Sequence, residues 1–94
     1  MIQEESFVHK TLELSTEFSK LVLSDEALAR KVPNEALIVF QIEGDEAYNT
    51  ESLRLAKVSH SREPERPILF VHVKGLAPVT SRLIEPHLEV ATRL

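Results

Sequence analysis

The segment ALIVFQI, residues 36–42, decides the fold of this chain of 94 residues. It is nearly continuously apolar and rich in β-branched and aromatic residues, which is typical of a strand buried in a sheet. A proline at position 33 precedes it, and Gly44 follows it. A second segment of the same character, ILFVHV, covers residues 68–73. We therefore predict two buried strands, over about residues 36–42 and 68–73.

The interval between the two strands, residues 43–67, predicts how they are connected. Apolar residues recur in it at helical spacing, and Asn49 or Thr50 can serve as the N-cap, which predicts a helix over about residues 50–60. The polar segment SREPERP then follows, and its prolines are typical of a surface loop. Parallel strands need a helical crossover of this kind, so we expect a βαβ unit.

The N-terminal part of the chain predicts helices. Its apolar residues recur at helical spacing between positions 6 and 23, and the clearest of them are Phe7, Leu14, Phe18 and Leu21. Ser6 can cap this helix, and Ser24 can cap a second, short one. Pro33 ends the second helix, because the residue before a proline is pushed out of helical geometry.

The C-terminal segment PHLEVAT, residues 86–92, alternates polar and apolar side chains as an edge strand does. Its proline fits the start of such a strand, where a missing N–H does no harm. The chain has the length of a single domain, residues 1–94. We predict the α/β fold class: a small two-layer domain with N-terminal helices, the βαβ unit and a third strand at the edge near residues 87–92.

A short internal match predicts how the two buried strands align. VFQIEG, residues 39–44, and FVHVKG, residues 70–75, share the same order of apolar, polar and charged residues before a glycine. If the strands pair in register, Gln41 lies beside His72 on one face of the sheet, and Glu43 lies near Lys74 on that same face. The opposite face is then wholly apolar and needs a helix to cover it.

Composition narrows the class of protein. Hydrophobic residues make up 43% of the chain and charged residues 28%, as in ordinary folded proteins. The absence of cysteine excludes disulfides, zinc fingers and thiol nucleophiles, and is compatible with a reducing cytosol. Acids stand near the N-terminus and no apolar run approaches about 18 residues, so we expect a cytoplasmic protein without a membrane anchor. A net charge of −4 works against nucleic-acid binding.

The acidic loop after the first strand is the first candidate binding site. Ligands of parallel α/β sheets bind beyond the carboxyl ends of the strands, where Glu43, Asp45 and Glu46 are expected. Their carboxylates are the oxygen ligands that Mg²⁺ and Ca²⁺ prefer. The loop lacks the ligand spacing of a calcium loop and the glycine-rich cradle of a nucleotide site. We therefore interpret it as a solvated turn, and keep a small-ligand or cation site as the alternative.

His72 and Lys74 complete the set of candidate binding residues. A histidine within an apolar strand can shuttle protons near neutral pH, or it can simply be hydrogen-bonded, here to Gln41 or to the C-terminal tail. No serine lies in a G-x-S-x-G turn, and no two histidines show the spacing of a zinc-binding helix. We therefore predict no catalytic residue, no metal ligand set and no cofactor.

Three segments carry a resemblance to a known family. They are SDEALARKVPNEALIVF, SLRLAK and RPILFVHVKGL, at residues 24–40, 52–57 and 66–76. With them the chain resembles a family of short uncharacterised bacterial proteins, a domain of unknown function. The resemblance implies a stand-alone bacterial cytosolic domain. It brings no activity with it, so no catalytic residue is carried across.

Two functions from different classes follow. A small sheet leaves strand edges unpaired, and such edges are often completed by a second copy of the chain. This favours a non-enzymatic interaction or regulatory module that self-associates, most simply as a homodimer, and that presents a surface to another protein. The alternative is a metal-assisted or small-ligand-binding enzyme that uses the acidic loop, residues 43–46.

Overall fold

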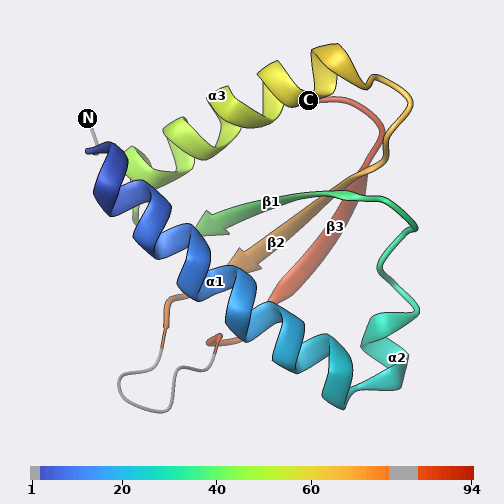
Figure 1. The fold of residues 1–94 in the computed structure, drawn as a ribbon. Coiled ribbons are helices and arrows are strands. Elements are labelled where there is room, and N and C mark those ends of the chain that lie inside the picture. The colour runs from blue at the N-terminus through green and yellow to red at the C-terminus, as the bar shows by residue number, and fades with distance from the viewer. Residues whose placement is uncertain (1–2, 77–82) are drawn as a thin grey trace.

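The computed structural model describes residues 3–76 and 83–94, and it consists of one three-stranded sheet with helices packed around it (Figure 1). The elements in chain order are α1 (Glu4–Ser24), α2 (Glu26–Ala29), β1 (Leu37–Ile42), α3 (Glu46–Arg62), β2 (Ile68–Val73) and β3 (His87–Ala91). The strand order is β1-β2-β3, with β1 parallel to β2 and β3 antiparallel to β2. The predicted α/β fold, with its βαβ unit and third edge strand, is confirmed.

The register between the parallel strands is the predicted one. Gln41 pairs with His72, and Ile42 pairs with Val73. Because side chains alternate along a strand, the even-numbered residues of β1 and the odd-numbered residues of β2 share one face. That face is the apolar one that the sequence predicted.

Helix α1 covers this apolar face and runs obliquely across the sheet (Figure 1). Its residues Phe7, Leu14 and Phe18 belong to the same buried cluster as Phe40 of β1 and Val71 of β2. The rings of Phe18 and Phe40 meet edge to face, with centroids 6.0 Å apart. Each such side chain contributes about 1.5–3 kcal/mol on burial, so this layer supplies most of the hydrophobic stabilisation.

Helix α3 contributes side chains to the apolar clusters on both faces of the sheet. At its start, Tyr48 lies in the α1-side cluster with its ring 4.9 Å from that of Phe7. Further along, Ala56 packs against Val39 and Ile68 on the opposite face. The remainder of that opposite face, toward β3, carries polar side chains and is only partly buried. No helix in the described residues is long and apolar enough to cross a membrane.

The helix starts differ from those predicted. Asn49 or Thr50 was the expected N-cap of α3, and this is wrong: the helix begins at Glu46, and the Asp45 carboxylate accepts the Tyr48 N–H at 3.1 Å. Gly44 makes this early start accessible, because its φ of 81° turns the chain directly from β1 into the cap.

The two N-terminal caps were also predicted wrongly. Helix α1 begins at Glu4, before Ser6, and no side chain caps it. Helix α2 is capped by Asp25 rather than by Ser24, and the Asp25 carboxylate accepts the Leu28 N–H at 3.1 Å. A carboxylate is at least as good a cap as a hydroxyl and also complements the helix dipole.

Candidate functional site

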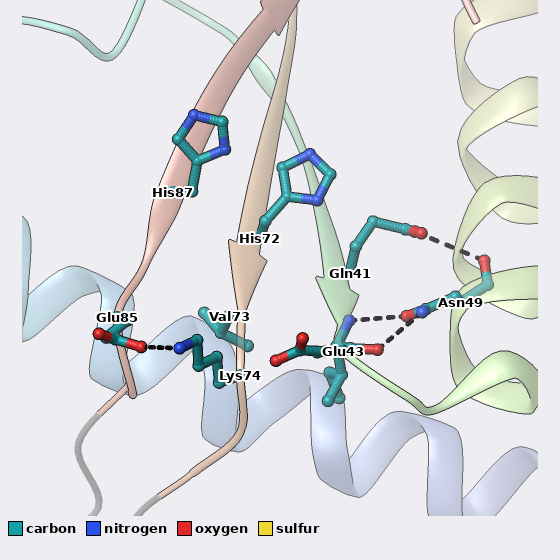
Figure 2. A pocket seen from close by; sticks show the side chains of 9 residues that line it. Gln41, Glu43, Asn49, His72, Val73, Lys74, Glu85 and His87 are labelled. Carbon is teal, nitrogen blue, oxygen red and sulfur yellow. Dashed lines mark hydrogen bonds and ion pairs between the residues drawn. The ribbon is translucent and has the colours of Figure 1, made fainter.

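A concave surface lies on the part of the sheet that α3 leaves open, at the carboxyl ends of β1 and β2 (Figure 2). Its volume is about 410 Å³. We call it the polar concavity, and it is lined by Gln41, Ile42, Glu43, Asn49, His72, Val73, Lys74, Glu85 and His87. Three of the predicted candidates, Glu43, His72 and Lys74, are therefore brought together here.

His72 stands at the centre of this surface. Its Nε2 atom lies 3.3 Å from a carboxylate oxygen of Glu89 on β3, so the predicted contact with the C-terminal tail exists. Its ring stacks on that of Phe70, with centroids 5.9 Å apart. On the neighbouring strand, the ring of His87 lies beside it with centroids 5.6 Å apart (Figure 2). Two imidazoles and a carboxylate thus line adjacent strands, where they can donate and accept hydrogen bonds.

Lys74 is paired differently from the expectation. Its ammonium forms an ion pair with Glu85, toward which it points in Figure 2, rather than with Glu43. The backbone N–H of Glu43 donates to the carbonyl of Val73 at 2.9 Å, so the two strand ends do lie side by side. Glu43 and Lys74 are therefore close along the backbone, as the register predicts. The Lys74 ammonium, however, pairs with Glu85 in the C-terminal segment.

The other two candidates, Asp45 and Glu46, do not line the polar concavity. Asp45 is the N-cap of α3, and its carboxylate also binds the Lys10 ammonium at 2.6 Å. The Lys10 hydrogen bond, followed by the Tyr48 N–H, lowers the pKa of Asp45 below its ordinary value. Glu46 is exposed in the first turn of the helix. The acidic loop is thus divided between a helix start and the concave surface.

Among residues 3–76 and 83–94, no three His, Asp or Glu side chains are placed so that they could hold a metal ion. The polar concavity offers imidazole, ammonium, amide and carboxylate groups that are exposed or partly exposed, and the Phe70 ring stacks on that of His72. Such a surface can hydrogen-bond a polar ligand or a peptide segment.

The outer edge of β1 is covered by α3. The Asn49 side chain makes a pair of hydrogen bonds with the backbone of Ile42: it accepts the N–H at 2.7 Å and donates to the carbonyl at 2.8 Å. The Ser52 hydroxyl donates to the Phe40 carbonyl at 2.9 Å. These side chains occupy backbone groups that a further strand would need.

The outer edge of β3 is different. Lys74 donates its N–H to the Ile84 carbonyl at 2.9 Å, and the pairing continues from His72 opposite His87. Backbone groups alternate in direction along a strand, so those of Leu88 and Val90 point away from β2. Within the part of the chain that the structure describes, no segment pairs with them. Val90 is also 54% exposed.

Sequence reasoning missed several of these roles. Asn49 was considered only as a helix cap, although its spacing from Ile42 is what lets it reach the strand edge. The sequence assigns no role to Glu85, His87 or Glu89 beyond the edge strand that it predicts near residues 87–92. The alternation within HLEVA could have indicated a shared surface, because it places His87 and Glu89 on one face of a strand.

The chain was compared with protein families, with curated proteins and with solved structures. Residues 6–86 match the family model described as "Family of unknown function (DUF5647)". No curated protein and no solved structure matches the chain.

Proposed function

We propose that this chain, which belongs to the family of unknown function DUF5647, acts as a non-enzymatic interaction or regulatory module that self-associates as a homodimer. The two copies join at the sheet, and each presents its polar concavity to a protein partner. The bacterial cytoplasm is the proposed setting, and it comes from the sequence resemblance given above.

The observation that carries this proposal is the asymmetry between the two sheet edges. Asn49 and Ser52 occupy the N–H and carbonyl of Ile42 and the carbonyl of Phe40 at the edge of β1, whereas the backbone groups of Leu88 and Val90 on β3 have no described partner. Natural proteins usually protect an edge strand with charge, proline or a covering element, because an open edge is a template for another strand. On this edge such protection is limited to Pro86 at the start and to the charge of Glu89, and Val90 is apolar and exposed.

Size-exclusion chromatography with light scattering tests self-association. We expect a mass of twice the 10.6 kDa chain at micromolar concentration, and a single-chain mass for Val90→Lys, since a charged lysine on an edge strand opposes pairing with a further strand. Val58→Lys is the matched control, because Val58 is 42% exposed and belongs to α3 rather than to β3. A wild-type protein that stays at 10.6 kDa contradicts the proposal, and so does equal dissociation of both variants.

A second candidate function is binding of a small polar ligand in the polar concavity. It keeps the ligand-binding part of the alternative that the sequence suggests, a metal-assisted or small-ligand-binding enzyme, and names no reaction. The supporting observation is that Glu43, His72 and Lys74 line one surface. A thermal-shift screen with Mg²⁺, Mn²⁺, Ca²⁺ and nucleotides tests it, because a ligand selective for the folded state raises the melting temperature.

Two variants separate the ligand sites in that screen. A ligand of the polar concavity loses its thermal shift in His72→Ala and keeps it in Asp45→Ala, since Asp45 lies outside this surface. A ligand of the acidic loop shows the reverse. An absence of any shift at millimolar ligand removes this second candidate.

A further inference from the structure

We infer that the two copies pair through β3 in one antiparallel register, in which Leu88 of one copy lies opposite Leu88 of the other. This inference rests on the proposed self-association and goes beyond it, since it names the interface and the residues that meet there. Each residue of β3 would then face a defined residue of the second copy, and charge decides between the registers available.

A symmetric antiparallel pair of β3 strands has three central registers, about Leu88, Glu89 or Val90. In the register about Glu89, this carboxylate lies opposite its own copy. Directly opposed like charges destabilise a strand pair, and Glu89 is exposed enough to carry its charge there. This register is therefore disfavoured.

The register about Val90 is also poor. It places His87 opposite Arg93 of the second copy, which offers no complementary charge. It also needs the backbone of Thr92, whose carbonyl oxygen already lies 3.1 Å from Nε2 of His60 on α3. The strand pair would lose that contact or one of its own hydrogen bonds.

The register about Leu88 avoids both problems. It places His87 opposite the second copy's Glu89, and the two-fold symmetry makes this contact twice. A histidine that directly faces a carboxylate can donate a hydrogen bond to it. Glu89 already contacts His72 of its own chain, so the second imidazole completes a row of three side chains across the interface.

The same register gives the exposed Val90 side chain an apolar surface. Val90 lies opposite Pro86 of the second copy, on the face covered by α1. Beside Pro86 is a groove of about 400 Å³ between α1 and the start of β3, lined by the apolar Leu21, Leu83 and Pro86 and by the polar Glu17, Lys20 and Ser24. Pro86 has no N–H to donate, so one backbone bond is lost on each side while the valine is buried.

This dimer would also complete the polar concavity. His87 lines that surface in each chain, and the second copy's Glu89 would stand directly beside it. The two concavities would then adjoin across the two-fold axis on the same face of a six-stranded sheet. A protein partner would meet both copies at once.

Single-cysteine variants test the register directly, because the chain has no cysteine of its own. The variants are Leu88→Cys, Glu89→Cys and Val90→Cys, oxidised at the same micromolar concentration and read on a non-reducing gel. In the inferred register the two residues at position 88 lie about 5.5 Å apart between Cα atoms, within the range of a disulfide. Those at position 90 lie roughly 14 Å apart, which is too far.

We expect Leu88→Cys to cross-link several times faster than the other two variants. Leu88 packs partly against the core, so circular dichroism accompanies each variant. If Leu88→Cys does not fold, an equimolar mixture of Pro86→Cys and Val90→Cys replaces it, since these positions face each other in the same register. Heterodimers in that mixture support the inference, and their absence contradicts it.

The outcomes separate this inference from the proposed function. Dominant cross-linking of Glu89→Cys or Val90→Cys overturns the register and leaves self-association in place. A dimeric mass by light scattering without cross-linking at any position shows that the copies join elsewhere, and overturns the inference alone. A monomeric wild-type protein overturns both.

Discussion

The Lys10 ammonium lies 2.6 Å from the Asp45 carboxylate, so an ion pair ties α1 to the N-terminus of α3. The same carboxylate accepts the Tyr48 N–H at 3.1 Å. Asp45 thus holds together the helix that covers the apolar face and the helix that covers the edge of β1. Its role in this geometry is to position two elements of the fold.

Asp45→Ala is expected to lower the free energy of unfolding by about 1–2 kcal/mol, because it removes a helix cap and exposes an unpaired helix N-terminus. Urea unfolding followed by circular dichroism measures this loss. Glu46→Ala is the matched control: Glu46 is exposed, and only its favourable contact with the helix dipole is lost, about 0.3–1 kcal/mol. Equal losses in the two variants would contradict the capping role.

The stability contribution of Asp45 should depend on pH. Lys10 and the Tyr48 N–H lower the pKa of this carboxyl in the folded state, so the contribution is present above its ordinary value of about 3.9 and is lost as the pH falls through the lowered pKa. The difference in urea midpoint between the wild type and Asp45→Asn should therefore be largest near pH 7 and shrink below pH about 4. A difference that is unchanged at pH about 2.5 would show that the carboxylate charge plays no part.

The sequence predicts the sheet better than it predicts the helix starts. Val39 and Phe70 stand in apolar runs whose pattern is local, and the matching glycines align those runs, so the pairing of Gln41 with His72 follows directly. The start of α3 is not local. Asp45 and Asn49 can both cap a helix. Asp45 takes this role because Lys10 of α1 binds its carboxylate, and because the Asn49 side chain binds the backbone of Ile42 instead.

In the candidate site, too, the local pattern of residues predicts some contacts, and contacts between distant segments could not be predicted. Gln41, His72 and Glu43 share one surface because the period of a strand places them there. The ion pair of Lys74 with Glu85 could not be predicted, because it depends on how the tail folds back along β2. Chain segments that meet only through the completed sheet leave little trace in the local pattern of residues.

Asn49→Ala is expected to destabilise the fold and to open the edge of β1. The variant leaves the N–H of Ile42 without its side-chain acceptor, which costs about 1–3 kcal/mol when the group stays shielded from water. It should also raise the fraction of oligomers larger than a dimer in light scattering, since a second edge becomes available. The stability of Asn49→Asp should lie between those of the wild type and Asn49→Ala. Its carboxylate still accepts the Ile42 N–H but cannot donate to the Ile42 carbonyl.

Those two readouts check the edge role of Asn49. Thr50→Ala is the control variant, because Thr50 is exposed on the same helix. An Asn49→Ala protein with wild-type stability and wild-type mass distribution would show that its side chain does not protect this edge.

Tyr48 should titrate at a higher pH in the folded protein than in the unfolded one. It is 1% exposed, and its hydroxyl lies 2.7 Å from that of Thr11. Burial raises its pKa most, the nearby Asp45 charge acts in the same direction, and the Thr11 hydrogen bond opposes them in part. Because the chain has one tyrosine and no tryptophan, absorbance of tyrosinate at about 295 nm reports this residue alone.

The folded protein should therefore reach half-ionisation above pH about 10, and in concentrated guanidinium chloride the midpoint should return to about 10. The neutral ring favours the folded state, so this contribution is present below pH about 10 and is lost as the pH rises through the raised pKa. Tyr48→Phe cannot ionise, so it should unfold at a higher pH than the wild type in an alkaline titration followed by circular dichroism. Coincident midpoints with and without denaturant would contradict the buried environment at the junction of α1 and α3.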